Sequence, residues 1–270
     1  MDFSHLMPVM LGLITGAILG LTGAGGAIIA VPMLTFGLRL PLADAAPIAL
    51  LAVAMAASLG TYFGFRKGIL RYKAAIAMSV TGVCLSPLGL WAAKKIPNSP
   101  LIGIFSLVLF YVSINMYRQA RRELHGFQVN QSSGPPCMLH EVHGKLVWTL
   151  PCFRAMIASG AIAGFLSGLL GVGGGFVIVP ALKKVTNLPA RSIIATSLGV
   201  ITFVSFGGVV GATLSGVMNW PIALPFAGGA LAGMLGGRSI GERIRGPRLQ
   251  QAFAAFAFCV AASMFTKAFY

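Results

Sequence analysis

The stretch GLTGAGGAIIAVP, residues 20–32, places a cluster of glycines inside a long apolar segment, and GLLGVGGGFVIVP, residues 168–180, does so again. Residue 168 follows residue 20 by 148 positions, and the closing prolines, Pro32 and Pro180, keep the same spacing. Glycine has no Cβ, so it adopts left-handed backbone conformations and leaves its N–H group uncovered. The repeated motif therefore predicts two helices that are broken by the same device.

The composition around these breaks is that of a membrane protein. Of 270 residues, 57% are hydrophobic and only 9% are charged, whereas about a quarter of a soluble domain is charged. Apolar runs of about 18 residues or more are long enough to cross the hydrocarbon as helices. We therefore expect an all-α polytopic membrane protein. Its apolar segments are expected at residues 6–36, 43–63, 74–93, 101–117, 155–182, 192–214, 221–237 and 249–269.

A polar stretch, residues 118–150, divides the chain into two membrane repeats, residues 1–117 and 151–270. Identical residues recur at the offset of 148 without a gap, from Gly16 with Gly164 to Gly68 with Gly216. Many transporters are built from such repeats, with the substrate site at the repeat interface. The internal duplication favours that class of protein.

The 20 basic residues predict how the repeats face the membrane. If all eight segments crossed, each face would hold ten of them, against the rule that cytoplasmic loops are enriched in Lys and Arg. If each broken segment enters and leaves on one side, one face holds sixteen and the other four. The repeats are then inverted, residues 118–150 are cytoplasmic, and both termini lie outside. A first half-helix that spans, followed by a short return, fits the same count. The four residues on the sparse face are Arg39, Lys94, Lys95 and Lys267.

The helix that follows each break presents free N–H groups and a partial positive charge, which together bind anions. Close helix packing also uses glycine, and it fits the regular spacings Gly12/Gly16/Gly20 and Gly229/Gly233/Gly237 better than binding does. Three glycines in four residues exceed what a packing face needs, so we interpret both clusters as binding sites. The candidate substrate-binding residues are Gly23, Gly25, Gly26, Gly171, Gly173 and Gly174, with hydroxyls from Thr22, Thr196 and Ser197.

Few other polar side chains lie inside the apolar segments, and such hydroxyls bond to their own helix backbone more often than to a ligand. They include Ser58, Thr61, Ser86, Asn115, Ser167, Thr202 and Ser205. No carboxylate or histidine lies in the middle of a segment, whereas cation carriers and proton relays keep such groups inside the bundle. The site therefore suits an anion, and we expect no metal and no cofactor.

The net charge of +15 and the cysteines suggest other classes of site, but simpler explanations exist. The basic residues lie between apolar segments, where they contact lipid headgroups rather than nucleic acid. Cys84, Cys137, Cys152 and Cys259 form no CxxC pair, so we expect no disulfide framework, and we expect Cys84 and Cys259 to act as small buried hydrophobes. Cys137, Glu141, His140 and His143 have metal-like spacing, for which a solvated loop is the simpler interpretation.

Several motifs together resemble the TauE/SafE family of membrane permeases. They are the glycine-rich break ending in proline, ATSL at residues 195–198, FRKGILRYKAA at residues 65–75 and GGALAGMLGGRSIGERI at residues 228–244. The resemblance implies a bacterial inner-membrane transporter of sulfur-containing anions such as sulfite, sulfonates and sulfoacetate. The first half has APIAL at residues 46–50 where the second has the Thr-Ser pair, so the two half-sites should not be equivalent.

Two other classes of function remain open from the sequence. A passive anion channel would use the same motifs, and single-channel currents would distinguish it from a carrier. An intramembrane enzyme is disfavoured, because the sequence has no membrane-buried histidine, no paired acid and no HExxH or GxSxG motif. The expected partners are a small anion and membrane lipids. The glycine-rich faces suit a homodimer as well as internal packing.

Overall fold

Ten α-helices form the computed structural model, which describes residues 3–23, 26–124, 137, 149–244 and 247–269. They are α1 (Phe3–Thr22), α2 (Ala27–Gly37), α3 (Leu42–Arg66), α4 (Tyr72–Lys95), α5 (Asn98–Leu124), α6 (Leu150–Leu170), α7 (Gly175–Val185), α8 (Ala190–Leu214), α9 (Trp220–Ile244) and α10 (Pro247–Phe269). These residues include no β-strand. Among them, α3, α4, α5, α6, α8 and α9 are long and apolar enough to cross a membrane. The expected all-α membrane fold is confirmed.

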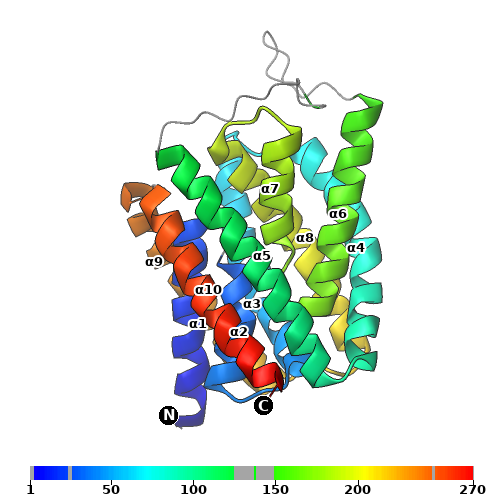
Figure 1. Cartoon of the computed structure of the whole chain (residues 1–270), viewed down its shortest axis with the longest axis vertical. Coiled ribbons are helices and arrows are strands. Elements are labelled where there is room, and N and C mark those ends of the chain that lie inside the picture. The colour runs from blue at the N-terminus through cyan, green and yellow to red at the C-terminus, as the bar shows by residue number, and fades with distance from the viewer. Residues whose placement is uncertain (1–2, 24–25, 125–136, 138–148, 245–246, 270) are drawn as a thin grey trace.

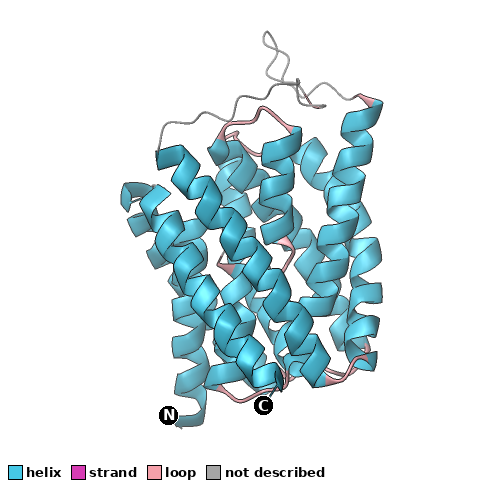
Figure 2. Ribbon diagram, viewed as in Figure 1, coloured by secondary structure: helices cyan, strands magenta, loops and turns pink. Residues whose placement is uncertain are grey.

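Each glycine cluster interrupts a helix. α1 ends at Thr22 and α2 begins at Ala27, while α6 ends at Leu170 and α7 begins at Gly175. Two of the eight predicted apolar segments are therefore split, which gives ten helices. Figure 2 shows the loops at the two breaks half-way along the molecule, whereas the other connections lie at its ends.

The helix bounds recur at the offset found in the sequence. α7 begins and ends 148 positions after α2, and α8 does so relative to α3. The turns after α3 and α8 each hold a glycine in the left-handed conformation, Gly68 with φ 66° and Gly216 with φ 69°. Similar local sequence therefore produces the same local structure in both halves.

The two broken segments run in opposite directions (Figure 1). α1 starts at the end of the molecule where the N- and C-termini lie, and α2 returns to that end. α6 starts at the opposite end, and α7 returns there. Each pair therefore has the shape of a hairpin whose tip is the glycine break.

Small residues bring helices from different halves into close contact. α1 packs against α9, and α6 packs against α4. A Cβ on Gly16 would overlap the carbonyl of Ala230, and a Cβ on Gly164 would overlap the carbonyl of Gly82. Membrane helices approach most closely through such residues. The predicted packing role is confirmed for Gly12, Gly16, Gly20, Gly229, Gly233 and Gly237, all of which face a neighbouring backbone inside the chain.

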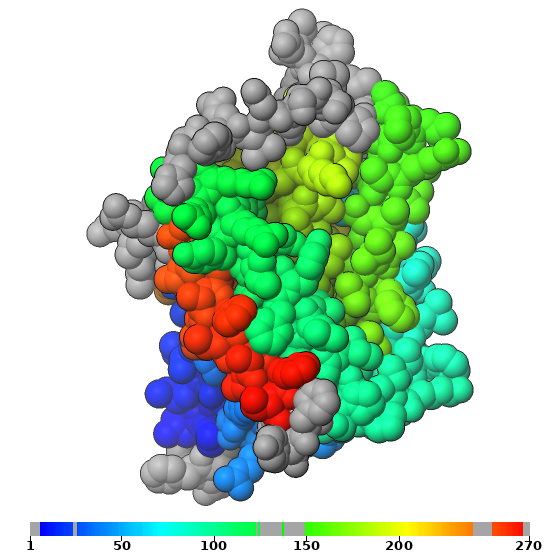
Figure 3. Space-filling view, in the orientation of Figure 1, coloured from blue at the N-terminus to red at the C-terminus, as the bar shows by residue number. Residues whose placement is uncertain are grey.

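α3 and α8 form the centre of the molecule. They contact one another, and each also packs against helices of the other half. In both, 72% of the most apolar stretch is buried, whereas no more than 44% is buried in α4, α5, α6 or α9. α5 and α10 pack together on the outside, across the face seen in Figure 3. The most protected positions therefore lie on α3 and α8.

The cysteines differ from the expectation. Cys137 and Cys152 form a disulfide with their Cα atoms 5.0 Å apart, and both residues are fully buried. The N–H of Cys137 also donates to the Val185 carbonyl at the end of α7. The prediction of no disulfide was wrong, because this pairing depends on where residue 137 docks and not on CxxC spacing. Cys84 and Cys259 are exposed on the outer surface rather than buried.

Candidate functional site

The second break, residues 171–174, leaves backbone donors uncovered. Gly171, Gly173 and Gly174 have left-handed φ angles of 71°, 70° and 70°. The N–H of Gly171 donates to the Ser167 carbonyl, and the next backbone donor in use is Val177, which donates to the Gly174 carbonyl. Within the described chain, the N–H groups of residues 172–176 therefore have no acceptor. They lie at the positive end of α7, where an anion is stabilised.

The first break, residues 23–26, is organised differently. Gly23 has a left-handed φ of 87°, but Gly26 has a helical φ of −63°. The N–H of Gly26 donates to Thr22 Oγ1 over 2.9 Å, and that hydroxyl donates to the Ile18 carbonyl over 2.8 Å. Thr22 and Gly26, both predicted as ligands, are therefore bonded to one another. Gly25 lies outside the described residues.

Each break rests on a central helix of the other half. A Cβ on Gly23 would lie 2.6 Å from Ile194 Cγ2 of α8. A Cβ on Gly171 would overlap Ala46 at the start of α3. Ile194 and Ala46 are themselves 148 positions apart, so the two contacts are equivalent. Both breaks therefore lie at the interface of the two halves.

The predicted Thr196–Ser197 pair lies on α8 between Ile194, which contacts the first break, and Ile201, which contacts the second. Both side chains are completely buried on α8. Thr196 Oγ1 accepts from the backbone N–H of Arg71 over 3.2 Å, and the Ser197 hydroxyl donates to the Ile194 carbonyl over 2.9 Å. Each hydroxyl therefore already has a partner within the protein.

Three serine hydroxyls near the second break have no partner within the described chain: Ser86 on α4, Ser167 on α6 and Ser205 on α8. Each residue is 0% exposed. Ser205 Oγ lies 2.8 Å from the position of a Cβ on Gly173. Ser86 Oγ lies 3.3 Å from the corresponding position on Gly208, one turn beyond Ser205. The predicted site omitted these hydroxyls, because the sequence shows only intramembrane serines and not which of them lack a backbone acceptor. Two other buried side-chain atoms also lack a hydrogen-bond partner within the described chain, Arg71 Nε and Ser79 Oγ.

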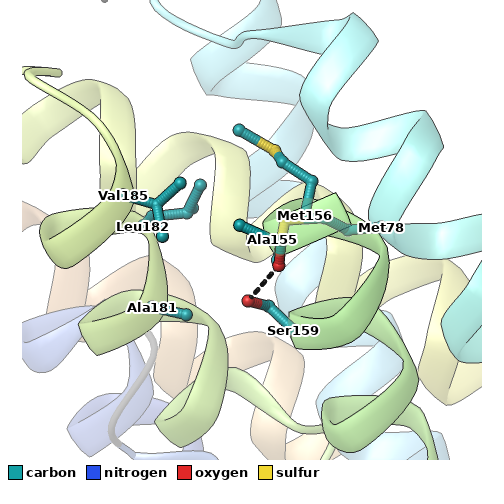
Figure 4. A pocket seen from close by; sticks show the side chains of 7 residues that line it. All are labelled: Met78, Ala155, Met156, Ser159, Ala181, Leu182 and Val185. Atoms are coloured by element: carbon teal, nitrogen blue, oxygen red, sulfur yellow. Dashed lines mark hydrogen bonds between the residues drawn. The ribbon is translucent and has the colours of Figure 1, made fainter. Parts of the chain in front are cut away.

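Two pockets lie away from both breaks. One lies between α4, α6 and α7 and is too narrow to hold a water molecule (Figure 4). Its one hydroxyl, on Ser159, donates to the Ala155 carbonyl over 2.7 Å. The other is a groove of about 650 Å³ between α4 and α8, lined by apolar residues with Lys94 and Ser215. Neither is lined by a residue of a break, and residues 171–176 are buried inside the bundle.

In the part of the chain that the structure describes, no three His, Cys, Asp or Glu residues are close enough to hold a metal ion. The sulfur of Cys137 is committed to the disulfide. His140, Glu141 and His143 lie outside the described residues.

The sequence matches the family model described as Sulfite exporter TauE/SafE over residues 9–264. It is 26% identical over 250 residues to the probable membrane transporter protein YunE of Bacillus subtilis strain 168, covering 90% of each chain. It is 30% identical over 222 residues to a probable membrane transporter protein of Methanocaldococcus jannaschii, covering 77% of this chain and 73% of the relative. A probable membrane transporter protein of Xylella fastidiosa strain Temecula1 is 27% identical over 238 residues, with 85% and 82% covered. No solved structure matches the chain significantly.

Proposed function

Since this chain belongs to the TauE/SafE family of membrane transporters, we propose that it carries small sulfur-containing anions of the sulfite, sulfonate or sulfoacetate type across the bacterial inner membrane. The chain is a multi-pass membrane protein, and its relatives are named as membrane transporters. The family description names sulfite export, which supports the substrate class. The site and its chemistry are argued from the residues below.

The observation that carries the proposal is the row of uncovered N–H groups at residues 172–176. Backbone at membrane depth must be buried in protein or line a wet cavity, because lipid offers no hydrogen-bond partner. Buried N–H groups almost always have an acceptor. A sulfite or sulfonate group brings several acceptor oxygens and a negative charge to the positive end of α7.

The substrate site therefore centres on Gly171, Gly173 and Gly174 in this proposal. At the first break the N–H group of Gly26 is not free for an anion, because it donates to the Thr22 hydroxyl. Thr196 and Ser197 also bond within the protein, so an anion would have to displace those partners.

The arrangement of the chain supports an inverted repeat. The opposite directions of the two hairpins agree with the orientation in which sixteen basic residues face the cytoplasm. In this orientation residues 118–150 join the membrane repeats 1–117 and 151–270 on the cytoplasmic side, and both termini lie outside. Alternating access would follow from one repeat rocking against the other around the breaks.

Counterflow in proteoliposomes tests the proposal. Vesicles loaded with unlabelled sulfite should take up radiolabelled sulfite faster than empty vesicles, with a rate that saturates. Thiosulfate, sulfoacetate, taurine, sulfate and chloride inside the vesicle then rank the substrates. Resolvable single-channel currents in a planar bilayer would instead support a passive anion channel. If none of these anions exchanges or conducts, the proposed transport function is wrong.

Substitution of the break glycines is a poor test of binding. A side chain at Gly173 would meet Ser205, Val53 and Ile201 at 2.8–3.1 Å, in a backbone conformation that is strained for other residues. A Gly173→Leu variant would therefore lose its fold and its anion together. Variants that remove a donor without adding volume are needed.

A further inference from the structure

We propose that the two breaks have different roles, and that the anion binds at the second one alone, where the hydroxyls of Ser86, Ser167 and Ser205 complete its coordination. At the first break the N–H groups of Gly23 and Gly26 already have acceptors within the protein, in Leu19 and Thr22. This inference rests on the proposed anion transport and specifies the residues that hold the anion.

The three hydroxyls are unusual because they are buried without a partner. Serines in membrane helices ordinarily return their hydroxyl to a backbone carbonyl of the preceding turn. Ser106 and Ser113 on α5 do so, with donor–acceptor distances of 2.8 and 2.9 Å. Buried polar groups without a partner are few in native proteins, and each calls for an explanation. Three of them beside one break indicate that a bound group supplies the missing partner.

The three serines come from three helices that meet beside the second break, where the backbone of Ser86 lies against Gly168 of α6. Ser205 on α8 points at Gly173, as the 2.8 Å distance from its Oγ to the position of a Cβ on that glycine shows. Ser167 lies in the last turn of α6, and its carbonyl holds the N–H of Gly171. Ser86 on α4 lies against Gly208, one turn along α8 from Ser205. The hydroxyls therefore add side-chain donors to the backbone donors of residues 172–176.

The equivalent positions in the first half carry no hydroxyl. At the offset of 148, Ser86 corresponds to Met234, Ser167 to Leu19 and Ser205 to Ala57. These residues are as buried as the serines, with 3%, 1% and 0% exposed. The first break therefore has apolar surroundings at the same three places, and its Gly26 N–H is bonded to Thr22. Desolvating an anion there would cost free energy with no hydroxyl at these three positions to offset it.

Neutral donors suit a transporter that must release its substrate. Hydroxyls and N–H groups hold an anion through hydrogen bonds and a helix dipole, without a full positive charge at the site. The site is thus selective for a group with several acceptor oxygens over a halide ion. An SO₃ group offers three such oxygens to the three hydroxyls.

Alanine variants of the three serines test the inference. We would measure sulfite binding to the purified full-length protein by calorimetry, and thermal unfolding without anion, for Ser86→Ala, Ser167→Ala and Ser205→Ala. Ser106→Ala and Ser113→Ala are matched controls, because those serines are equally buried but bonded to their own helix. Each site variant should bind sulfite about tenfold more weakly, because it loses one hydrogen bond to a charged ligand. Its melting temperature without anion should stay equal or rise, because an unsatisfied buried group has been removed. The controls should keep the wild-type affinity.

The two proposals fail in different ways. If the wild type binds sulfite and the site variants bind it equally well, the serine site is wrong and anion transport stands. The same holds if the site variants melt earlier without anion while their affinity is unchanged, because the hydroxyls then serve packing. If Thr196→Val weakens binding as strongly as Ser205→Ala, binding at the second break alone is overturned. If the wild type binds none of sulfite, sulfonate and sulfate, the proposed function is wrong and the site inference falls with it.

Discussion

The two glycine breaks share a sequence motif, a position half-way along the molecule and a contact with the opposite half, yet their hydrogen bonding differs. In the first, Thr22 accepts from Gly26. In the second, Leu170 stands where the first has Thr22, and three residues of the turn have left-handed φ angles. The same glycine motif therefore has a side-chain acceptor for one of its N–H groups in the first break and none in the second. The difference arises from a few side chains around the same glycine pattern.

The largest effect on stability should come from the packing glycines that occupy equivalent positions in the two halves. Gly16→Leu and Gly164→Leu would each force a side chain into the backbone of a helix from the other half, at Ala230 and Gly82 respectively. We expect both to destabilise the protein by about 3 kcal/mol or more, as overpacking a tight contact does. Thermal unfolding in detergent measures this loss of stability. Gly228→Ala is the control, since nothing lies within 4 Å of its added Cβ, and it should be neutral or slightly stabilising. If only one of the two leucine variants melts early, the packing of the halves is less symmetric than the contacts indicate.

The disulfide is the next largest difference between the halves, because the Cys137–Cys152 bond ties residue 137 only to the second hairpin. The bond closes a segment of 15 residues, so a Cys137→Ser/Cys152→Ser variant should lose about 3 kcal/mol of stability by the chain-entropy estimate. A reducing agent should lower the melting temperature of the wild type by the same amount and leave the double variant unchanged.

The disulfide also tests the orientation of the membrane repeats. Disulfides persist in oxidising compartments and are rare in the cytoplasm. Maleimide labelling in intact cells, with Cys84 and Cys259 replaced by serine, should reveal whether Cys137 and Cys152 are reduced. Free thiols would fit residues 118–150 in the cytoplasm. A complete disulfide in cells would contradict that orientation and the count of basic residues on which it rests.

A smaller contrast is expected between Gly23→Ala and Gly171→Ala. Both positions have left-handed φ angles, which cost alanine about 1–2 kcal/mol. At Gly23 the added Cβ meets the γ-methyl group of the Ile194 side chain, whereas at Gly171 it meets the backbone of Ala46. Gly171→Ala should therefore melt at the lower temperature. Ile194→Ala should recover part of the stability lost in Gly23→Ala, and the absence of any recovery would mean that the strain lies in the backbone alone.

The smallest effect concerns the hydrogen bond across the first break. Thr22→Val removes the hydroxyl that accepts from Gly26, and should lower stability by about 1 kcal/mol, as the loss of one intramolecular hydrogen bond does. Sulfite affinity in the same calorimetric measurement should not change. A variant with wild-type stability and weaker binding would return Thr22 to the substrate site, where the sequence analysis first put it.

The sequence by itself determined much of the architecture. Long uncharged runs have no stable place except in a membrane, so the helices, their number and their breaks follow from composition and glycine pattern alone. The offset of 148 predicted an internal repeat in the same way, and the same offset separates the bounds of α2 from those of α7 and the bounds of α3 from those of α8. The family resemblance rested on local motifs, which can be recognised without knowledge of the tertiary contacts.

Only the tertiary structure decided which polar groups are free. Thr22, Thr196 and Ser197 are plausible ligands in the sequence, but their hydroxyls are bonded to Gly26, Arg71 and Ile194. Ser86, Ser167 and Ser205 look ordinary in the sequence, and become distinctive only when three helices bring them to one break without partners. The Cys137–Cys152 pair likewise depends on where a polar segment docks. Helix formation is encoded locally, whereas satisfaction of a hydrogen bond is a property of the neighbours, and these are set by the packing of segments far apart in the chain.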